Sequence, residues 1–231
     1  MKKEKLKLAI VSLASCEGCQ FAILELGQRF FDLFEHYELV EMRLFEDEPD
    51  VPLYDICLIE GSAVIEEELE TLKKVRKKSK ILVALGACAV LGGIPERGNQ
   101  EIRPLREMVK IDFEIPGCPP VNTEILEALE QLRFGRIPKI PEQTICFECP
   151  FFGQDCYLHQ KKACLGPIIL AGCGAVCLKN NYRCEGCRGP LKDEKKENIR
   201  NMLKLLKQIS QPREIEHLLQ KFGLEDDLFE D

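Results

Sequence analysis

Cysteine is the residue through which this sequence of 231 residues could do chemistry, because twelve of its thirteen cysteines fall into three sets of four. The first set is Cys16, Cys19, Cys88 and Cys118, the second is Cys146, Cys149, Cys156 and Cys164, and the third is Cys173, Cys177, Cys184 and Cys187. Four thiolates are the ligand set of a [4Fe–4S] cluster. Three such sets predict three [4Fe–4S] clusters and electron transfer, since a chain that conducts electrons over a distance needs several stations.

The first set follows predicted strands. Cys16 and Cys19 form a Cys-x-x-Cys directly after a strand, Cys88 comes after the fourth strand, and Cys118 after the fifth. Because the carboxyl ends of parallel strands meet at one edge of a sheet, we expect these four thiols to converge there. Two other interpretations remain open at this point: a thioredoxin-like redox pair at Cys16 and Cys19, and a structural zinc site with four thiolates.

The elements that must position these cysteines alternate between strand and helix patterns over residues 1–138. Strands are expected at Leu6–Leu13, Leu39–Phe45, Asp55–Glu60, Lys80–Leu85 and Ile111–Ile115. Helical spacing of apolar residues occurs over Phe21–Phe34, Glu66–Lys78 and Asn122–Phe134. This alternation predicts an α/β domain with a flavodoxin-like parallel sheet that binds the first cluster.

A second, irregular domain is predicted over residues 139–231. Residues 142–190 hold eight cysteines and no long periodic stretch, so we expect metal centres rather than side chains alone to hold this segment together. The spacing of Ile199, Met202, Leu203, Leu206 and Ile209 predicts a helix, and a second helix is expected after Pro212. The domain is therefore expected to be an iron–sulfur domain with C-terminal helices.

The net charge and the composition argue against nucleic-acid binding and against a membrane span. A net charge of −7 is atypical of a nucleic-acid-binding protein, and no apolar run approaches the length of a membrane span. No export signal is recognisable, so we expect a cytoplasmic location, where thiols stay reduced and metal binding is favoured over disulfides. The thirteenth cysteine, Cys57, lies in an apolar strand pattern and is expected to be a core residue.

Three other features concern cofactors and the sheet edge. The run Gly172–Cys177 imitates a dinucleotide-binding G-x-G-x-x-G, but cysteine replaces its third glycine and no strand–helix–strand unit surrounds it. The first loop of the sheet offers Cys-Glu-Gly-Cys rather than hydroxyls for a flavin phosphate, so flavin and NAD(P) are expected on another subunit. Glu17 and Glu60 both lie at the edge where the first set is expected to converge. Glu60 is expected either to accept hydrogen bonds from loop amides or to relay protons.

These motifs resemble those of the small subunits of [NiFe] hydrogenases. The matching runs are Cys16-Glu17-Gly18-Cys19, Glu60-Gly61-Ser62, Gly86-Ala87-Cys88-Ala89 and Gly117-Cys118-Pro119-Pro120. The resemblance covers Leu6 to about Pro190 and implies a subunit that docks on a large subunit holding the Ni–Fe centre. It also implies that the first set binds the proximal cluster, the third set the medial cluster and the second set the distal cluster.

The chain departs from the well-known periplasmic members of that family. They use a histidine as one distal ligand, where this chain has Cys146, and they carry a three-iron medial cluster, where Cys177 supplies a fourth thiolate. They also have a twin-arginine leader, which is not recognisable here. The resemblance is therefore to the cytoplasmic branch, namely F420-non-reducing hydrogenases and, on its Lys/Glu-rich composition, the delta subunit of NADP-linked sulfhydrogenases.

The expected function is electron transfer within a hydrogenase, between the Ni–Fe site of the large subunit and further flavin or iron–sulfur subunits linked to NAD(P). The chemistry on H2 is expected in the large subunit, so no residue of this chain is expected to be catalytic. Two alternatives remain. One is a relay subunit of the kind found in respiratory complex I or energy-converting hydrogenases, against which stand the spacing of Cys16 and Cys19 and the eight-cysteine extension. The other is a structural zinc protein.

Overall fold

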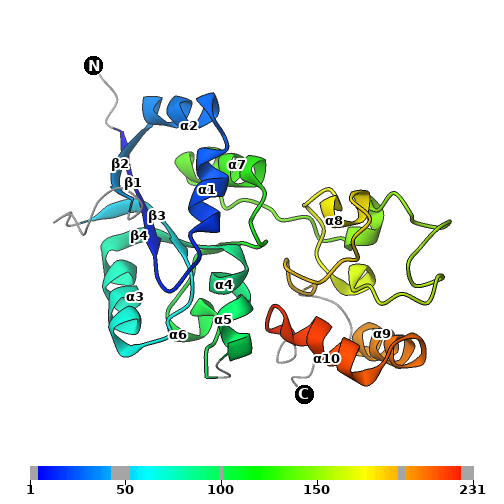
Figure 1. The fold of residues 1–231 in the computed structure, drawn as a ribbon. Helices are drawn as coiled ribbons and strands as arrows, with labels where there is room; N and C mark the ends of the chain where they lie inside the picture. The colour runs from blue at the N-terminus through cyan, green and yellow to red at the C-terminus, as the bar shows by residue number, and fades with distance from the viewer. Residues whose placement is uncertain (1–4, 43–52, 99–100, 192–195, 225–231) are drawn as a thin grey trace. The chain divides into compact units, whose positions relative to one another are not determined.

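The computed structural model describes residues 5–42, 53–98, 101–191 and 196–224. The chain divides between Pro138 and Lys139 into two compact units. The first unit contains the sheet, and the second contains the last two helices of the chain (Figure 1).

The first unit is built on a five-stranded sheet in which every neighbouring pair is parallel. The strands are β1 (Leu6–Ser12), β2 (Tyr37–Met42), β3 (Tyr54–Glu60), β4 (Ser79–Leu85) and β5 (Phe113–Ile115), in the spatial order β2-β1-β3-β4-β5. This is the flavodoxin-like strand order, so the predicted α/β class and parallel sheet are confirmed. Of the predicted strand Leu39–Phe45, residues 43–45 lie outside the described part of the chain.

Helices lie between strands of this unit and after its last strand. They are α1 (Gly18–Leu24), α2 (Gln28–Asp32), the 3₁₀ helix η1 (Leu33–Glu35), α3 (Glu66–Lys78), α4 (Gly86–Leu91), α5 (Gly93–Gly98), α6 (Leu105–Met108) and α7 (Asn122–Arg133). The prediction of one helix over Phe21–Phe34 was wrong. Gly27 takes φ 58° and ψ −123°, a conformation outside the helical region that glycine adopts readily, and it separates α1 from α2.

Both faces of the sheet are buried, and side chains alternate between the two faces along each strand. One face packs in a hydrophobic cluster with residues of α1, α2 and α7, and it carries Leu8, Ile10, Ile56, Leu58, Val83 and Leu85. Figure 1 shows α1 and α7 close together and apart from α3. The other face carries Ala9, Val11, Cys57, Ile59, Leu82 and Ala84, all buried. Because both faces are covered, a functional site is expected at the ends of the strands.

Cys57 is a core residue, as the sequence predicts. It is fully buried and lies between Ala9 of β1 and Leu82 of β4 in the parallel register. It belongs to the middle of β3, three residues before Glu60 at the carboxyl end of that strand.

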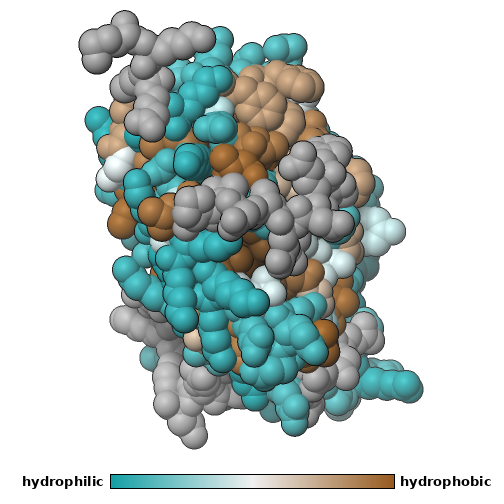
Figure 2. Space-filling view, turned by 90° about the vertical axis from the view of Figure 1, so that its left-hand side faces the viewer, coloured by the Kyte–Doolittle hydropathy of each residue, from teal (hydrophilic) through white to brown (hydrophobic). Residues whose placement is uncertain are grey.

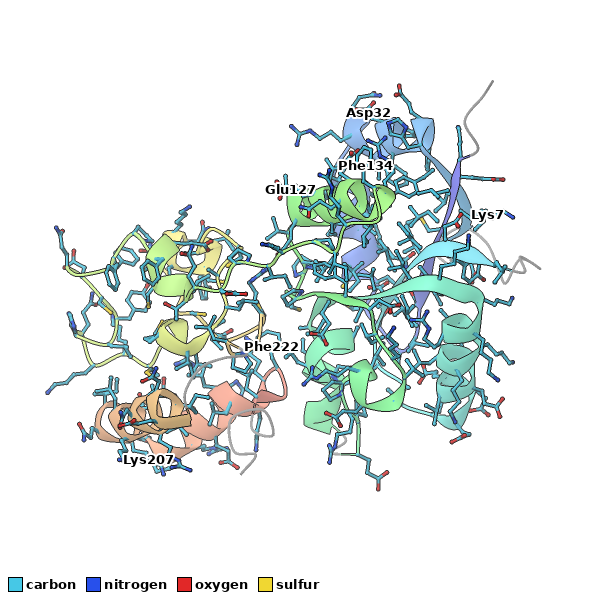
Figure 3. All side chains as sticks on the ribbon, turned by 180° about the vertical axis from the view of Figure 1, so that it is seen from behind. Lys7, Asp32, Glu127, Phe134, Lys207 and Phe222 are labelled. Atoms are coloured by element: carbon cyan, nitrogen blue, oxygen red, sulfur yellow. The ribbon has the colours of Figure 1, made fainter. Side chains whose placement is uncertain are left out.

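The outer surface of this unit is mainly polar where α3 lies. Figure 2 shows this side of the molecule, with hydrophilic side chains gathered over its lower part. In Figure 3, Asp32, Glu127 and Phe134 lie on the same side of the unit, where α2 and α7 are found. None of the helices in the described ranges is both long enough and apolar enough to cross a membrane.

The second unit has little regular structure before its last two helices. Its elements are the 3₁₀ helices η2 (Ile145–Glu148) and η3 (Gly166–Ile168), then α8 (Val176–Lys179), α9 (Lys196–Ile209) and α10 (Pro212–Gln220). The buried residues of α9 and α10 include Leu206 and Leu218, whereas Lys207 is exposed and lies at the outer side of the unit in Figure 3. The two predicted C-terminal helices are therefore present.

Candidate metal centres

The first set of cysteines lies on three loops at the carboxyl edge of the sheet. Cys16 and Cys19 follow β1, Cys88 lies in α4 directly after β4, and Cys118 follows β5. Their thiols are close enough to influence one another. The pKa of Cys19 is raised by burial, by Glu60, and then by Cys88 and Cys118, and Cys16 also acts to raise the pKa of Cys88. The structure thus brings all four thiols together.

Glu60 holds the loop that carries Cys19. Its carboxylate is 1% exposed and accepts hydrogen bonds from Ser12 Oγ at 2.9 Å, from Gln20 Nε2 at 2.8 Å and from the backbone N–H of Cys19 at 3.2 Å. Gln20 is itself fully buried. From the sequence, Glu60 is expected either to accept hydrogen bonds from loop amides or to relay protons. Its contact with the Cys19 amide is of the first kind.

Ser62 connects the other loops. Its backbone exchanges hydrogen bonds with Ala14, at 3.0 and 3.2 Å, in the loop after β1. Its Oγ lies 3.0 Å from the carbonyl oxygens of both Cys88 and Gly92. A side chain at Gly61, where φ is +86°, would place its Cβ 2.7 Å from the carbonyl oxygen of Ala14. The run Glu60-Gly61-Ser62 therefore fastens the Cys19 loop and the Cys88 helix to the end of β3.

Gly86 makes room for Cys19. A Cβ atom at Gly86 would lie 2.3 Å from Cys19 Sγ, and the residue has φ +86°. The following residue, Ala87, donates its N–H to the carbonyl oxygen of Gly117 at 2.8 Å, which joins the Cys88 and Cys118 loops. Glycine at position 86 is therefore required both by its backbone conformation and by the neighbouring thiol.

Glu17 has a local role in the same loop. It precedes α1 with a left-handed backbone (φ 59°), and its N–H donates to Ser15 Oγ at 3.1 Å. This turn separates Cys16, which is exposed, from Cys19, which is half-buried.

The second set gathers around Cys146. Burial raises the pKa of the Cys146 thiol to about 12, and Cys164, Cys149 and Cys156 each add to that shift. Backbone amides point at sulfur in this set: the N–H of Phe151 donates to Cys149 Sγ at 3.4 Å, and Gly166 donates to the Cys164 thiol. Such donors stabilise negative charge on thiolate sulfur.

In the third set, electrostatic interactions with neighbouring cysteines are found at two thiols, those of Cys184 and Cys177. Burial raises the pKa of Cys184 well above its usual value, and among the thiols Cys164 of the second set adds most, followed by Cys187 and Cys173. Cys177 is exposed, but partial desolvation still raises the pKa of its thiol, and Cys173 contributes next. The loop before α8 uses left-handed conformations at Gly174 and at Ala175, so its glycine-rich appearance reflects the turn around the cysteines.

The second and third sets meet at Cys164 and Cys184. Both residues are buried, and the N–H of Leu165 donates to the carbonyl oxygen of Cys184 at 3.0 Å. The backbone N–H of Cys184 also donates to the Cys164 thiol. The backbone therefore joins the two sets directly at these residues.

The arrangement fits iron–sulfur clusters. Within the described ranges, no three His, Cys, Asp or Glu side chains are grouped as ligands of a single metal ion. The thiols of the first set nevertheless lie together, as do those of the second set, whereas Cys184 of the third set lies near Cys187 and Cys173 and also near Cys164. A glycine leaves space at Cys19, and amide N–H groups are directed at several sulfurs. A cluster needs four thiolates spread over its corners and is tuned by such amide donors.

Sequence reasoning missed several residues that shape these centres. Ser12 and Gln20 complete the contacts of Glu60, and Gly86, known from the sequence only as part of a motif, makes space for Cys19. Glu148 and Arg188 contact the segment that leads into Cys173. Their positions beside cysteines in the sequence were the available signal, but only the fold shows what their side chains contact.

Comparisons with known proteins agree with this description. Residues 16–132 match the family model described as NADH ubiquinone oxidoreductase, 20 Kd subunit. Sulfhydrogenase 2 subunit delta of Pyrococcus furiosus is 32% identical over 94% of this chain and 99% of its own length. A subunit of the F420-non-reducing hydrogenase vhu of Methanococcus voltae is 29% identical over 80% of this chain and 83% of its own length.

A solved structure also contains a chain whose fold is similar to that of this chain. A chain of an NAD+-reducing [NiFe]-hydrogenase in the H2-reduced state is 31% identical and gives a TM-score of 0.56, covering 60% of this chain and 96% of that one. The chain belongs to the family of the 20 kDa subunit of NADH ubiquinone oxidoreductase, and within it to the small subunits of [NiFe] hydrogenases.

Proposed function

We propose that this chain relays electrons through three [4Fe–4S] clusters between the Ni–Fe site of a large subunit and a further redox subunit. The proximal cluster is bound by Cys16, Cys19, Cys88 and Cys118, the medial cluster by Cys173, Cys177, Cys184 and Cys187, and the distal cluster by Cys146, Cys149, Cys156 and Cys164. The observation that carries the proposal is the convergence of Cys16, Cys19, Cys88 and Cys118 from three loops on one edge of the sheet.

The reaction served is H2 ⇌ 2 H⁺ + 2 e⁻, which takes place in the large subunit. The clusters supply one-electron transfer, and this chain's residues hold them. The cysteines bind iron as thiolates, so loading the sites releases the protons that burial keeps on the thiols. Backbone N–H groups directed at Cys149 and Cys164 then stabilise the negative charge.

The medial cluster is proposed to be a cubane because Cys177 supplies a fourth thiolate. Cys177 lies at the start of α8 and shares its surroundings with Cys173. A distal cluster with four thiolates is proposed because Cys146 lies within electrostatic reach of Cys149, Cys156 and Cys164.

Metal analysis of the natively isolated protein tests the cluster content. We expect about twelve irons and twelve sulfides per chain, which is the content of three [4Fe–4S] clusters. Stoichiometric zinc in place of iron would indicate a structural zinc protein instead.

A second experiment separates electron relay from catalysis. In Cys88→Ser, hydrogen-dependent dye reduction should be lost while H/D exchange at the nickel site of the large subunit largely remains. Equal loss of both activities would contradict a relay role. Cys57→Ala is the control, because Cys57 is a buried cysteine in β3 away from the sheet edge and its replacement by alanine should leave the iron content unchanged.

The electron acceptor is proposed to be NAD(P), reached through a further subunit in the cytoplasm. Support comes from the similar chain of the NAD+-reducing enzyme. Anaerobic native purification tests this proposal by identifying the chains that co-purify and by measuring flavin and nickel. A nickel-containing partner without any flavin or NAD(P)-dependent activity would contradict the NAD(P) link while leaving the relay intact.

A further inference from the structure

Three short segments lie side by side in the second unit. The segment around Ile169 and Ala171 is hydrogen-bonded on one side to residues 143–145, through Ile145 N–H to Ile169 O and Ala171 N–H to Gln143 O, both at 2.8 Å. On its other side, Leu170 N–H donates to Gly189 O at 3.0 Å. The central segment leads directly into Cys173, and the segment at Gly189 follows Cys187.

Arg188 links two of these segments, its own and the central one, next to the third set of cysteines. Its side chain is buried, with 3% of the residue exposed, and its Nε donates to the carbonyl oxygen of Ala171 at 2.8 Å. A guanidinium remains charged at every accessible pH. The positive charge of Arg188 is therefore placed in the interior of this unit.

Gly172 accommodates the guanidinium. A Cβ atom at Gly172 would lie 2.6 Å from Arg188 Nη2, and the residue has φ +117°. The backbone N–H of Gly172 donates to Glu148 Oε1 at 2.8 Å. Arg188 thus directly follows Cys187, one ligand of the proposed medial cluster. Its guanidinium also lies against Gly172, the residue that precedes a second ligand, Cys173.

We propose that Arg188 is a positioning residue for the medial cysteines and that its charge raises the reduction potential of the cluster they bind. A cluster with four thiolate ligands is anionic, and its potential depends on nearby charge and on burial. A buried positive charge favours addition of an electron, because opposite charges interact more strongly where water is excluded. This inference rests on the proposed function.

Arg183 provides a comparison on the same set of cysteines. It precedes Cys184 as Arg188 follows Cys187, but its side chain is 25% exposed and forms ion pairs with Glu214 and, at 3.6 Å, with Glu185. Its charge is therefore screened by solvent to a greater extent than that of Arg188, which is 3% exposed. Arg183 should have little effect on the cluster.

The test is an EPR-monitored redox titration of the full chain in its complex with the large subunit, purified anaerobically. The medial signal is the one that Cys177→Ser alters. Arg188→Gln should shift the midpoint potential of that signal to more negative values, whereas Arg183→Gln should leave it unchanged. Arg188→Lys keeps the charge and should retain a potential close to that of the unaltered protein.

An unshifted potential in Arg188→Gln, or an equal shift in Arg183→Gln, would overturn the inference. If Arg188→Gln binds too little iron to be titrated, Arg188→Lys decides the question: a potential near the unaltered value supports the role of charge, and a large negative shift or loss of the cluster overturns it. Absence of the medial signal in the unaltered complex would instead contradict the proposed function.

Discussion

The Oε2 atom of Glu60 accepts a hydrogen bond from the backbone N–H of Cys19 at 3.2 Å, across 41 positions in the sequence. The same carboxylate accepts from Ser12 Oγ and Gln20 Nε2. A buried carboxylate is costly unless hydrogen bonds replace its hydration. Glu60 meets that requirement with donors that include the loop presenting the proximal cysteines, so its burial and the position of that loop depend on each other.

Glu60→Gln should destabilise the protein and loosen the Cys19 loop. The new amide NH2 group would face at least one of the present donors, and an unsatisfied buried polar group costs about 1–3 kcal/mol. The melting temperature and the iron content of the purified chain measure the two effects. Glu41→Gln is the matched control: Glu41 is 4% exposed and accepts from Tyr54 on β3, but lies in β2, away from the cysteines. Equal iron loss in both variants would contradict the role assigned to Glu60.

Gly86→Ala should abolish iron binding by the first set of cysteines. Its Cβ would lie 2.3 Å from Cys19 Sγ, so the thiol would have to move. Gly27→Ala is the control, because Gly27 also has a positive φ (+58°) but nothing lies within 4 Å of a Cβ placed there. The unfavourable backbone conformation alone costs about 1–3 kcal/mol in each variant. Iron content should fall in Gly86→Ala only, and unchanged iron there would contradict the steric argument.

Cys57→Ala should leave the iron content unchanged and reduce the free energy of unfolding by about 1 kcal/mol, as expected for a small deletion in a core. Cys57→Ser should cost more, because it buries a hydroxyl group in an apolar strand. Denaturant unfolding and iron analysis distinguish the variants. Loss of iron in Cys57→Ala would show that this cysteine is a ligand after all.

Asp112→Asn should weaken stability at neutral pH and reduce the loss of stability in acid. Burial acts to raise the pKa of Asp112, but hydrogen bonds from Leu82 N–H, Arg76 and Lys110 hold it below its usual value. A carboxylate with a lowered folded-state pKa contributes stability above its unfolded pKa, and that contribution is lost as pH falls through the folded pKa.

The unaltered protein should therefore be more stable than Asp112→Asn by about 1–2 kcal/mol near neutral pH, the lower part of the range for hydrogen bonds to a charge, because the site is partly open to solvent. The difference should disappear in acid, and unfolding measured from neutral to acid pH tests this. Glu127→Gln, at an exposed position of α7 (Figure 3), is the control and should not alter the acid dependence. A pH-independent difference would contradict the assignment.

The amino-acid order alone is enough to predict the main strands, and it indicates that the cysteines bind metal. Apolar runs such as Asp55–Glu60 indicate which residues are buried, and cysteine spacing indicates a capacity to bind metal, because both patterns are local along the chain. The folded chain adds that Glu60 meets Cys19, that Gly86 leaves room for the Cys19 thiol, and that Arg188 reaches Ala171. These contacts join residues far apart in sequence, and their geometry depends on strand order and loop conformation, which no local pattern contains.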